Sequence, residues 1–162
     1  MVAEAICVAV LALGMPNAET ACRYMQDVVE AAEKYDLDPV LIVSLIRVES
    51  RWTPTAVSRS KACGLMQVLA KYTKPKLTCK QLLDPKTSIR VGVKKLNFWI
   101  YKYGKGNIRT GLCGYNAGFR CKGKNKNTIG YYRYAPKVLK YKRKIKRQLK
   151  KQKDFLDIHH KL

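Results

Sequence analysis

Residues 38–49 read DPVLIVSLIRVE, a helix-start signal followed by an apolar run. Asp38 is typical of a residue that caps a helix, and Pro39 is typical of the first helical position. Residues 40–48 are apolar nearly all round, so we predict that this helix is central and buried. Glu49 ends the run, where we expect the helix to leave the core.

Other helices are predicted on both sides of this run. Apolar residues recur at helical spacing over residues 20–35 and 89–103. Asp84-Pro85 repeats the start signal before the second stretch, and Asn107 is expected to cap a helix through Tyr115. We also predict a short helix over residues 64–72, a last helix over residues 130–151, and loops over residues 51–63 and 117–128. Strand signals are weak throughout, so the predicted fold class is an all-α single domain.

The charge of this 162-residue chain is large and unevenly distributed. Residues 1–49 carry 3 basic and 8 acidic residues, a net charge of −5, whereas residues 50–153 carry 29 basic residues and one acid, a net charge of +28. Such a field attracts polyanions. Nucleic acid, anionic lipid, lipopolysaccharide and anionic cell wall all qualify, and charge alone does not choose among them.

The N-terminus carries an apolar run over residues 5–15 that is shorter than the roughly 20 residues of a transmembrane helix. It is similar to the hydrophobic part of a secretory signal, with Ala18 as the last residue before cleavage. Two details oppose this interpretation. Glu4 rather than a basic residue precedes the run, and Pro16 is a poor third residue before a cut. We predict a cleaved signal over residues 1–18, with a retained anchor and an ordinary buried helix as the alternatives.

The cysteines show no metal-site spacing. No pair has the C-x-x-C pattern, so we predict no zinc site. Cys113 and Cys121 bracket a short loop and are the pair we expect first, while the alternative is that all the cysteines are reduced core residues. Loss of a signal would remove Cys7 and leave one thiol unpaired or shared between chains. The six cysteines are Cys7, Cys22, Cys63, Cys79, Cys113 and Cys121.

Glu49 lacks a carboxylate partner downstream in the sequence. Asp84 is the only acid among residues 50–153, and its Asp-Pro setting suits a helix cap. Two-carboxylate glycoside hydrolysis needs an acid and also a nucleophile or base. If Glu49 is catalytic, it therefore acts alone, first as acid and then as base. A glutamate at a helix end is, on its own, more often simply solvated.

Four sequence blocks follow one another along the chain. They are Glu49-Ser50-Arg51-Trp52 with Pro54, Ala56 and Ser58; Gly64-Leu65-Met66-Gln67; Gly114-Tyr115-Asn116-Ala117-Gly118; and Tyr134-Ala135-Pro136-Lys137-Val138-Leu139. With these blocks the chain resembles the lytic transglycosylase family of the soluble (Slt) type, which has a goose-lysozyme-like α fold. The resemblance covers roughly residues 22–144.

Together with the N-terminal apolar run and the basic C-terminal stretch, the resemblance predicts three parts of the chain. These are a signal or apolar segment over residues 1–18, a transglycosylase-like catalytic domain over residues 19–136, and a basic helix and tail over residues 137–162.

The chain departs from the family pattern at four positions. Lys61 stands where the family often has Gly, and Thr53 stands where Asn is common. Gly114 replaces an Ala of the third block. Gly130 occupies a position where some members carry a second Glu, which agrees with the scarcity of acids in this part of the chain.

The resemblance implies a mechanism for Glu49. The glutamate protonates the glycosidic oxygen between N-acetylmuramic acid and N-acetylglucosamine, while the acetamido group of the substrate stabilises the developing cation. Glu49 then removes the proton of the sugar 6-hydroxyl, which attacks the anomeric carbon and gives a 1,6-anhydromuramic end. No cofactor and no metal is implied.

The resemblance also implies roles around Glu49. Met66 and Tyr115 would shield the glutamate, and the alternative for Met66 is core packing. Gln67 and Asn116 would bind acetamido groups, and the alternative for both amides is loop capping.

Two further side chains have implied roles. Tyr134 would support Glu49 with its hydroxyl group, and the alternative is helix packing. Ser58 would hold the loop or contact the sugar.

Residues 137–153 hold ten Lys or Arg, and Val138, Tyr141, Ile145 and Leu149 fall at helical spacing. The apolar stripe predicts core contact. The opposite face suits anionic wall polymers or lipid headgroups. The expected main partner is the peptidoglycan glycan strand, and we do not expect nucleic acid.

The expected location is the periplasm, the extracellular space or a phage virion. Two other functions remain open, a hydrolytic muramidase on the same fold and a non-catalytic polyanion-binding protein.

Overall fold

The computed structural model describes residues 1–121 and 130–159, and the predicted all-α class is confirmed. Part of the loop predicted over residues 117–128 lies outside these residues. The helices are α1 Val2–Ala12, α2 Ala18–Arg23, α3 Met25–Lys34, α4 Pro39–Glu49, α5 Cys79–Leu82, α6 Pro85–Asn97, α7 Ile108–Ala117 and α8 Ala135–His159. Short elements complete the described chain: strands β1 Ala62–Cys63 and β2 Val68–Leu69, 3₁₀ turns η1 Ala70–Tyr72 and η3 Gly118–Cys121, and π-helical turns η2 Phe98–Tyr103 and η4 Gly130–Tyr134.

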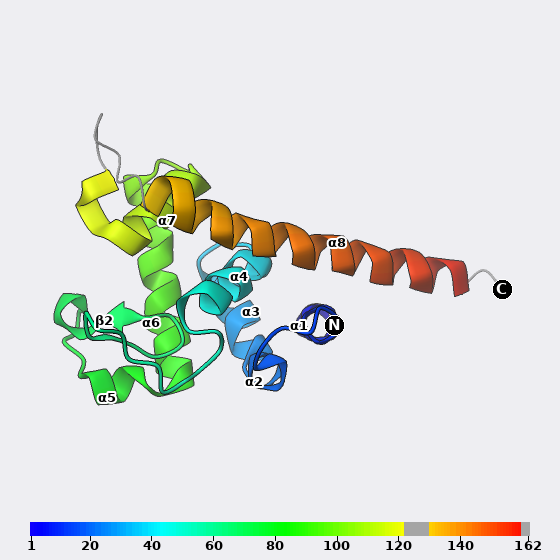
Figure 1. Cartoon of the computed structure of the whole chain (residues 1–162), viewed down its shortest axis with the longest axis horizontal. Helices are drawn as coiled ribbons and strands as arrows, with labels where there is room; N and C mark the ends of the chain where they lie inside the picture. The colour runs from blue at the N-terminus through cyan, green and yellow to red at the C-terminus, as the bar shows by residue number, and fades with distance from the viewer. Residues whose placement is uncertain (122–129, 160–162) are drawn as a thin grey trace.

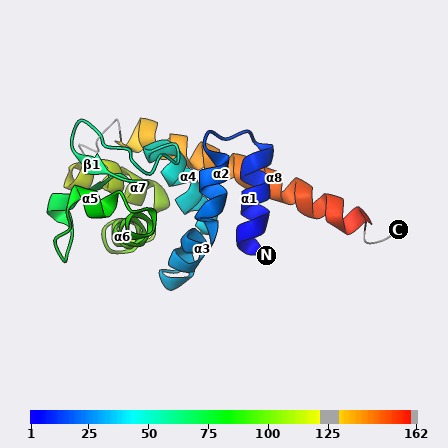
Figure 2. The same cartoon turned by 90° about the horizontal axis from the view of Figure 1, so that it is seen from below.

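Helix α4 lies at the centre of the core, as its apolar run predicts. All residues from Val40 to Ile46 are buried. Helix α8 crosses over α4, and its C-terminal end extends beyond the other helices (Figures 1 and 2). The predicted stripe of α8 faces inward, since Val138 and Ile145 are fully buried. The boundary expected between residues 136 and 137 therefore falls inside a helix that packs on the core.

The predicted helix starts are confirmed by side-chain caps. Asp38 accepts the N–H of Val40 at 2.9 Å. Asp84 likewise accepts the N–H of Thr87 at 2.8 Å at the start of α6, and Asn107 accepts the N–H of Thr110 at 2.9 Å at the start of α7. Each cap satisfies a backbone donor that has no partner within the helix.

The short helix predicted over residues 64–72 is wrong. This stretch forms a hairpin in which Ala62 pairs with Leu69 and Cys63 pairs with Val68, followed by a single 3₁₀ turn. Gly64 has φ +78°, and a Cβ atom there would lie 2.0 Å from the carbonyl oxygen of Leu82. The left-handed conformation and the close approach both require glycine, so this residue turns the chain instead of starting a helix.

The helix predicted over residues 20–35 is divided in two. Tyr24 has φ −107° and ψ 12°, which ends α2 and begins α3.

The N-terminal segment forms helix α1 and contributes to the core. Ile6, Ala9 and Val10 are buried, and α1 contacts both α3 and α8. This is the arrangement of the buried-helix alternative, while cleavage after Ala18 stays a prediction. Within the described residues, no helix is long and apolar enough to span a bilayer.

Three disulfide bonds link the six cysteines, so the alternative of reduced core cysteines is not the state of this structure. The predicted pair Cys113–Cys121 is confirmed. The other pairs are Cys7–Cys22 and Cys63–Cys79.

Candidate active site

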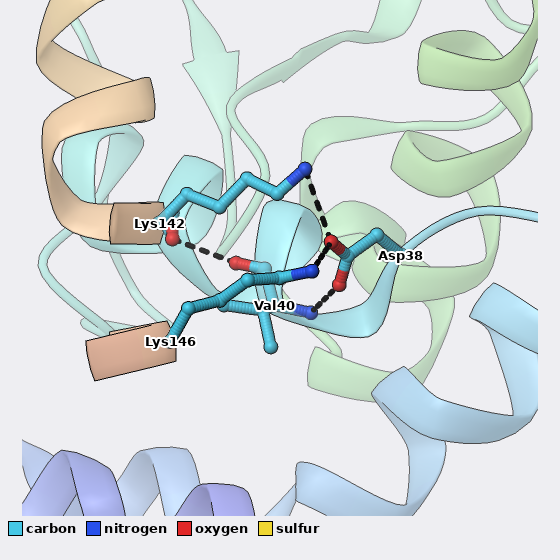
Figure 3. Close-up of polar contacts among 5 residues, drawn as sticks. Asp38, Val40, Lys142 and Lys146 are labelled. Atoms are coloured by element: carbon cyan, nitrogen blue, oxygen red, sulfur yellow. Dashed lines mark hydrogen bonds and ion pairs between the residues drawn. The ribbon is translucent and has the colours of Figure 1, made fainter. Parts of the chain in front are cut away.

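Helix α4 is fixed at the end opposite Glu49 by an ionic contact with α8. Besides capping α4, Asp38 accepts from Lys142 at 3.0 Å and from Lys146 at 2.9 Å (Figure 3). The two lysines hold the pKa of Asp38 below its usual value in spite of burial, which alone would raise it. The contact therefore holds α8 against the start of the helix that ends at Glu49.

Glu49 lies at the C-terminal end of α4, where it meets the beginning of α8. The hydroxyl group of Tyr134, in the turn η4 immediately before α8, donates a hydrogen bond to Oε1 of Glu49. Burial raises the pKa of Glu49 to about 7, and the hydrogen bond from Tyr134 opposes this rise only in part. Glu49 can therefore hold a proton near neutral pH, as a general acid must.

The many basic residues of the chain do not cancel the rise in the pKa of Glu49. Among the described residues, no lysine or arginine forms an ion pair with the Glu49 carboxylate. Burial, and then the charge of Glu49, raise the pKa of both Tyr134 and Tyr115 well above that of an ordinary tyrosine. Both tyrosines are therefore neutral hydroxyl donors next to the carboxyl group.

Tyr115 connects helix α7 to the turn of the hairpin. Its hydroxyl group donates to the carbonyl oxygen of Met66 at 2.7 Å. The backbone N–H of Met66 in turn donates to the hydroxyl oxygen of Ser88 on α6 at 3.1 Å. Met66 itself is fully buried. The structure thus brings Tyr115 and the backbone of Met66 together, and Tyr115 is close enough to Glu49 for the glutamate charge to raise its pKa. The Met66 side chain has a core position, and its shielding of Glu49 stays a prediction.

Gln67 and Ser58 hold the segment that precedes and forms the hairpin. The Gln67 amide donates to the carbonyl oxygens of Ala56 and Gly64, both at 3.0 Å. The Ser58 hydroxyl oxygen accepts the N–H of Ala62 at 3.0 Å. Both side chains therefore hold this loop, which is one of the two roles predicted for each of them. Their contact with sugar stays a prediction.

Asn116 is exposed on α7, next to the buried site residues. Its predicted hydrogen bond to an acetamido group stays a prediction, and its exposure leaves it accessible to a ligand.

Two residues of the site region were missed by sequence reasoning. Trp52 is fully buried in the turn after Glu49, and its position in the first block was the only signal for it. Trp99 explains the departure at Gly114, because a Cβ atom at residue 114 would lie 2.4 Å from Cε3 of the Trp99 ring. Glycine therefore allows the tryptophan to pack directly on the helix that carries Tyr115.

The described residues contain no group of three or more His, Cys, Asp or Glu side chains that could hold a metal ion. The acid Asp84 is exposed, and the hydrogen bond from the backbone of Thr87 lowers its pKa. Asp84 is therefore an ionised helix cap.

The sequence pattern of the transglycosylase SLT domain family matches residues 26–135. This match covers most of the chain and includes Glu49, the hairpin, α7 and Tyr134. The chain therefore belongs to the transglycosylase SLT domain family.

Curated relatives of the chain are longer proteins. Membrane-bound lytic murein transglycosylase C of Edwardsiella ictaluri (strain 93-146) is 47% identical over 49 residues, which are 30% of this chain and 14% of that protein. Membrane-bound lytic murein transglycosylase E of Buchnera aphidicola subsp. Acyrthosiphon pisum (strain APS) is 35% identical over 82 residues, which are 44% of this chain and 37% of that protein. The matched part of this chain thus spans well under half the length of these relatives.

The fold also matches a solved structure, that of an inactive mutant of the lytic transglycosylase Slt from Pseudomonas aeruginosa. The match has a TM-score of 0.63 and 24% sequence identity, and it covers 77% of this chain and 24% of that one. At this identity the match establishes the fold, which is the one that the sequence blocks imply.

Proposed function

We propose that this protein is a peptidoglycan lytic transglycosylase in which Glu49 acts first as acid and then as base. The observation that carries the proposal is a single partly buried carboxyl group with a pKa of about 7, held by the hydroxyl of Tyr134. Membership in the transglycosylase SLT domain family and the names of the two lytic murein transglycosylases support the same reaction class.

In the first step, protonated Glu49 transfers its proton to the glycosidic oxygen between N-acetylmuramic acid and N-acetylglucosamine. The C–O bond to the leaving sugar breaks, and the acetamido group of the muramic residue stabilises the positive charge at the anomeric carbon. Such substrate assistance needs no protein nucleophile. Tyr134 stabilises the glutamate anion that this step creates, because its hydroxyl group donates to the carboxylate.

In the second step, the Glu49 carboxylate removes the proton from the 6-hydroxyl of the same muramic residue. The oxygen attacks the anomeric carbon and closes the 1,6-anhydro ring, so that Glu49 regains its proton and no water is consumed. Asp84, the only acid among residues 50–153, already caps α6 as an anion, and this supports the single-glutamate route over two-carboxylate hydrolysis.

The products released from purified peptidoglycan test this proposal directly. We expect muropeptides that end in 1,6-anhydromuramic acid, identified by mass spectrometry, because the 6-hydroxyl replaces water as the nucleophile. These ends resist reduction by borohydride. Ends that borohydride reduces, as the main product, would identify a hydrolytic muramidase, and no cleavage at all would favour the non-catalytic alternative.

The proposed place of action is outside the cytoplasm, in the periplasm, in the extracellular space or on a phage particle. Three disulfide bonds support this location, since such bonds persist in oxidising compartments. We further propose that α8 holds anionic wall polymers. Of the ten basic residues over positions 137–153, two pair with Asp38 and the other eight are exposed with no ion pair among the described residues.

Charge reversal at Lys140 and Lys151 tests the role of α8 in wall binding. Both side chains are exposed, so Lys140→Glu with Lys151→Glu changes the field without disturbing the core. Binding to intact walls should weaken severalfold at low salt, where the Debye length exceeds about 10 Å. Turnover of a short soluble glycan should stay unchanged, because Glu49 and Tyr134 are untouched.

The matched control is Lys80→Glu with Lys102→Glu, which makes the same change in net charge at exposed positions outside α8. Equal loss of wall binding in both double variants would show that total charge, rather than α8, draws the protein to the wall.

A further inference from the structure

The side chain of Asn17 reaches the turn that follows Glu49. Its amide nitrogen donates to the carbonyl oxygen of Arg51 at 2.9 Å and to Oγ1 of Thr53 at 3.3 Å. These two acceptors lie two and four residues after the proposed acid. Thr53 is also one of the positions at which the chain departs from the family pattern. A residue far away in the sequence is thus bonded directly to the segment that leaves the active site.

The turn after Glu49 has an unusual backbone. Arg51 has φ +53° and Trp52 has φ +61°, so two consecutive residues with side chains adopt the left-handed region. This region is disfavoured for residues other than glycine, asparagine and aspartate. A strained turn of this kind persists only where the surrounding structure holds it. Burial of the Trp52 ring provides one such restraint, and the amide of Asn17 provides a second.

Asn17 is itself held in place by its neighbours. It lies in the connection between α1 and α2, inside the ring that the Cys7–Cys22 disulfide closes. Its φ of +56° is one that asparagine adopts readily. Asn17 occupies the N-cap position of α2, yet its side chain makes no capping hydrogen bond there. An asparagine in this position normally caps its own helix. Here the side-chain oxygen accepts no such bond, and the amide nitrogen of the same side chain donates across the fold to Arg51 and Thr53.

We propose that Asn17 is a positioning residue that fixes the turn over residues 50–53 and, through that turn, the Glu49 carboxyl group. The inference rests on the proposed function of Glu49. It concerns a part of the chain before residue 26, outside the region matched to the family. On this view, the segment whose composition is similar to a secretory signal contributes to the active site of the folded protein.

Two substitutions remove the Asn17 donor in different ways. Asn17→Gly keeps the left-handed backbone and removes the side chain, whereas Asn17→Asp keeps the size and the backbone preference and cannot donate. The two variants share only the loss of the N–H donor. Lys105→Gly is the control, because Lys105 is also exposed and left-handed, with φ +50°, and lies beyond the π-helical turn η2.

We expect both Asn17 variants to lower kcat about tenfold with KM nearly unchanged, since small displacements of a catalytic group cost rate rather than binding. The indole N–H of Trp52 should also exchange with solvent faster, as measured by NMR. The Lys105→Gly variant should match the wild type in all three quantities. A purely structural role for Asn17 would lower the melting temperature without this selective loss of kcat.

Two results would overturn the inference: wild-type kcat in both variants, or a loss of kcat in Asn17→Gly alone. If the wild type itself releases no anhydro product, the proposed function fails instead. The exchange rate of the Trp52 indole then still decides whether Asn17 holds the turn.

Discussion

Replacement of Glu49 by glutamine is expected to lower the release of anhydro-muropeptides by at least about 10²-fold, the low end for loss of a general acid or base. Glutamine keeps the size and polarity of the side chain, but it can neither give a proton to the glycosidic oxygen nor take one from the 6-hydroxyl. Tyr134 can still donate to the amide oxygen, so the local packing should survive. Activity is measured on purified peptidoglycan, and folding is monitored by circular dichroism.

The matched control is Asp84→Asn, the same chemical change at the only acid among residues 50–153. Asparagine can still cap α6, and Asp84 has no role in the proposed reaction, so this variant should keep nearly full activity. A folded Glu49→Gln protein with near-normal activity would rule out the assignment. A large loss in Asp84→Asn with an intact fold would show that a second carboxylate takes part.

The helix starts could be predicted because their causes are local. Asp38 caps the N–H of Val40 two residues later, and Asp84 caps the N–H of Thr87 three residues later. A side chain and a backbone donor this close in sequence meet whenever the helix forms. The apolar run of α4 likewise predicts its burial, since a helix without a polar face must lie inside the fold.

The hairpin could not be predicted because its causes are distant in the sequence. Gly64 turns where the carbonyl of Leu82 passes within contact distance, and the Cys63–Cys79 disulfide ties the first strand to α5. Neither neighbour can be inferred from residues 62–69 alone. Strands of two residues are also too short to show an alternating pattern.

In the candidate site, too, features with a local cause could be predicted from the sequence, and contacts between distant residues could not. Glu49 could be singled out by the scarcity of acids and by its sequence block. The hydrogen bond from Tyr134, however, joins residues 85 positions apart, and the bond from Asn17 to Arg51 joins residues 34 positions apart. The first of these was expected only from the family resemblance. No sequence pattern pointed to the bond from Asn17 to Arg51, because the residues around Asn17 favour a secretory signal that is cleaved off.

The free energy of unfolding should depend on pH through Glu49. Its pKa is about 7 in the folded protein, against 4.5 for an ordinary glutamate. Between these values the folded state keeps a proton that the unfolded state has released. Wild-type stability should therefore fall as pH rises through this window and level off above pH 7, where both states are ionised. Glu49→Gln escapes this loss, so its stability relative to wild type should increase by up to about 3 kcal/mol between pH 4.5 and pH 8.

Urea unfolding of both proteins at pH 4.5 and pH 8, with the disulfide bonds intact, measures this difference. The exposed residue Glu33 supplies the control, because Glu33→Gln gives the background pH dependence that follows the loss of one surface carboxylate. If the stability difference between Glu49→Gln and wild type is the same at both pH values, the carboxyl group is not held in its protonated form by burial. In that case Glu49 could not store the proton that the first step of the proposed reaction requires. The same variant therefore tests the acid role in two independent ways, once through the rate and once through the stability of the folded state.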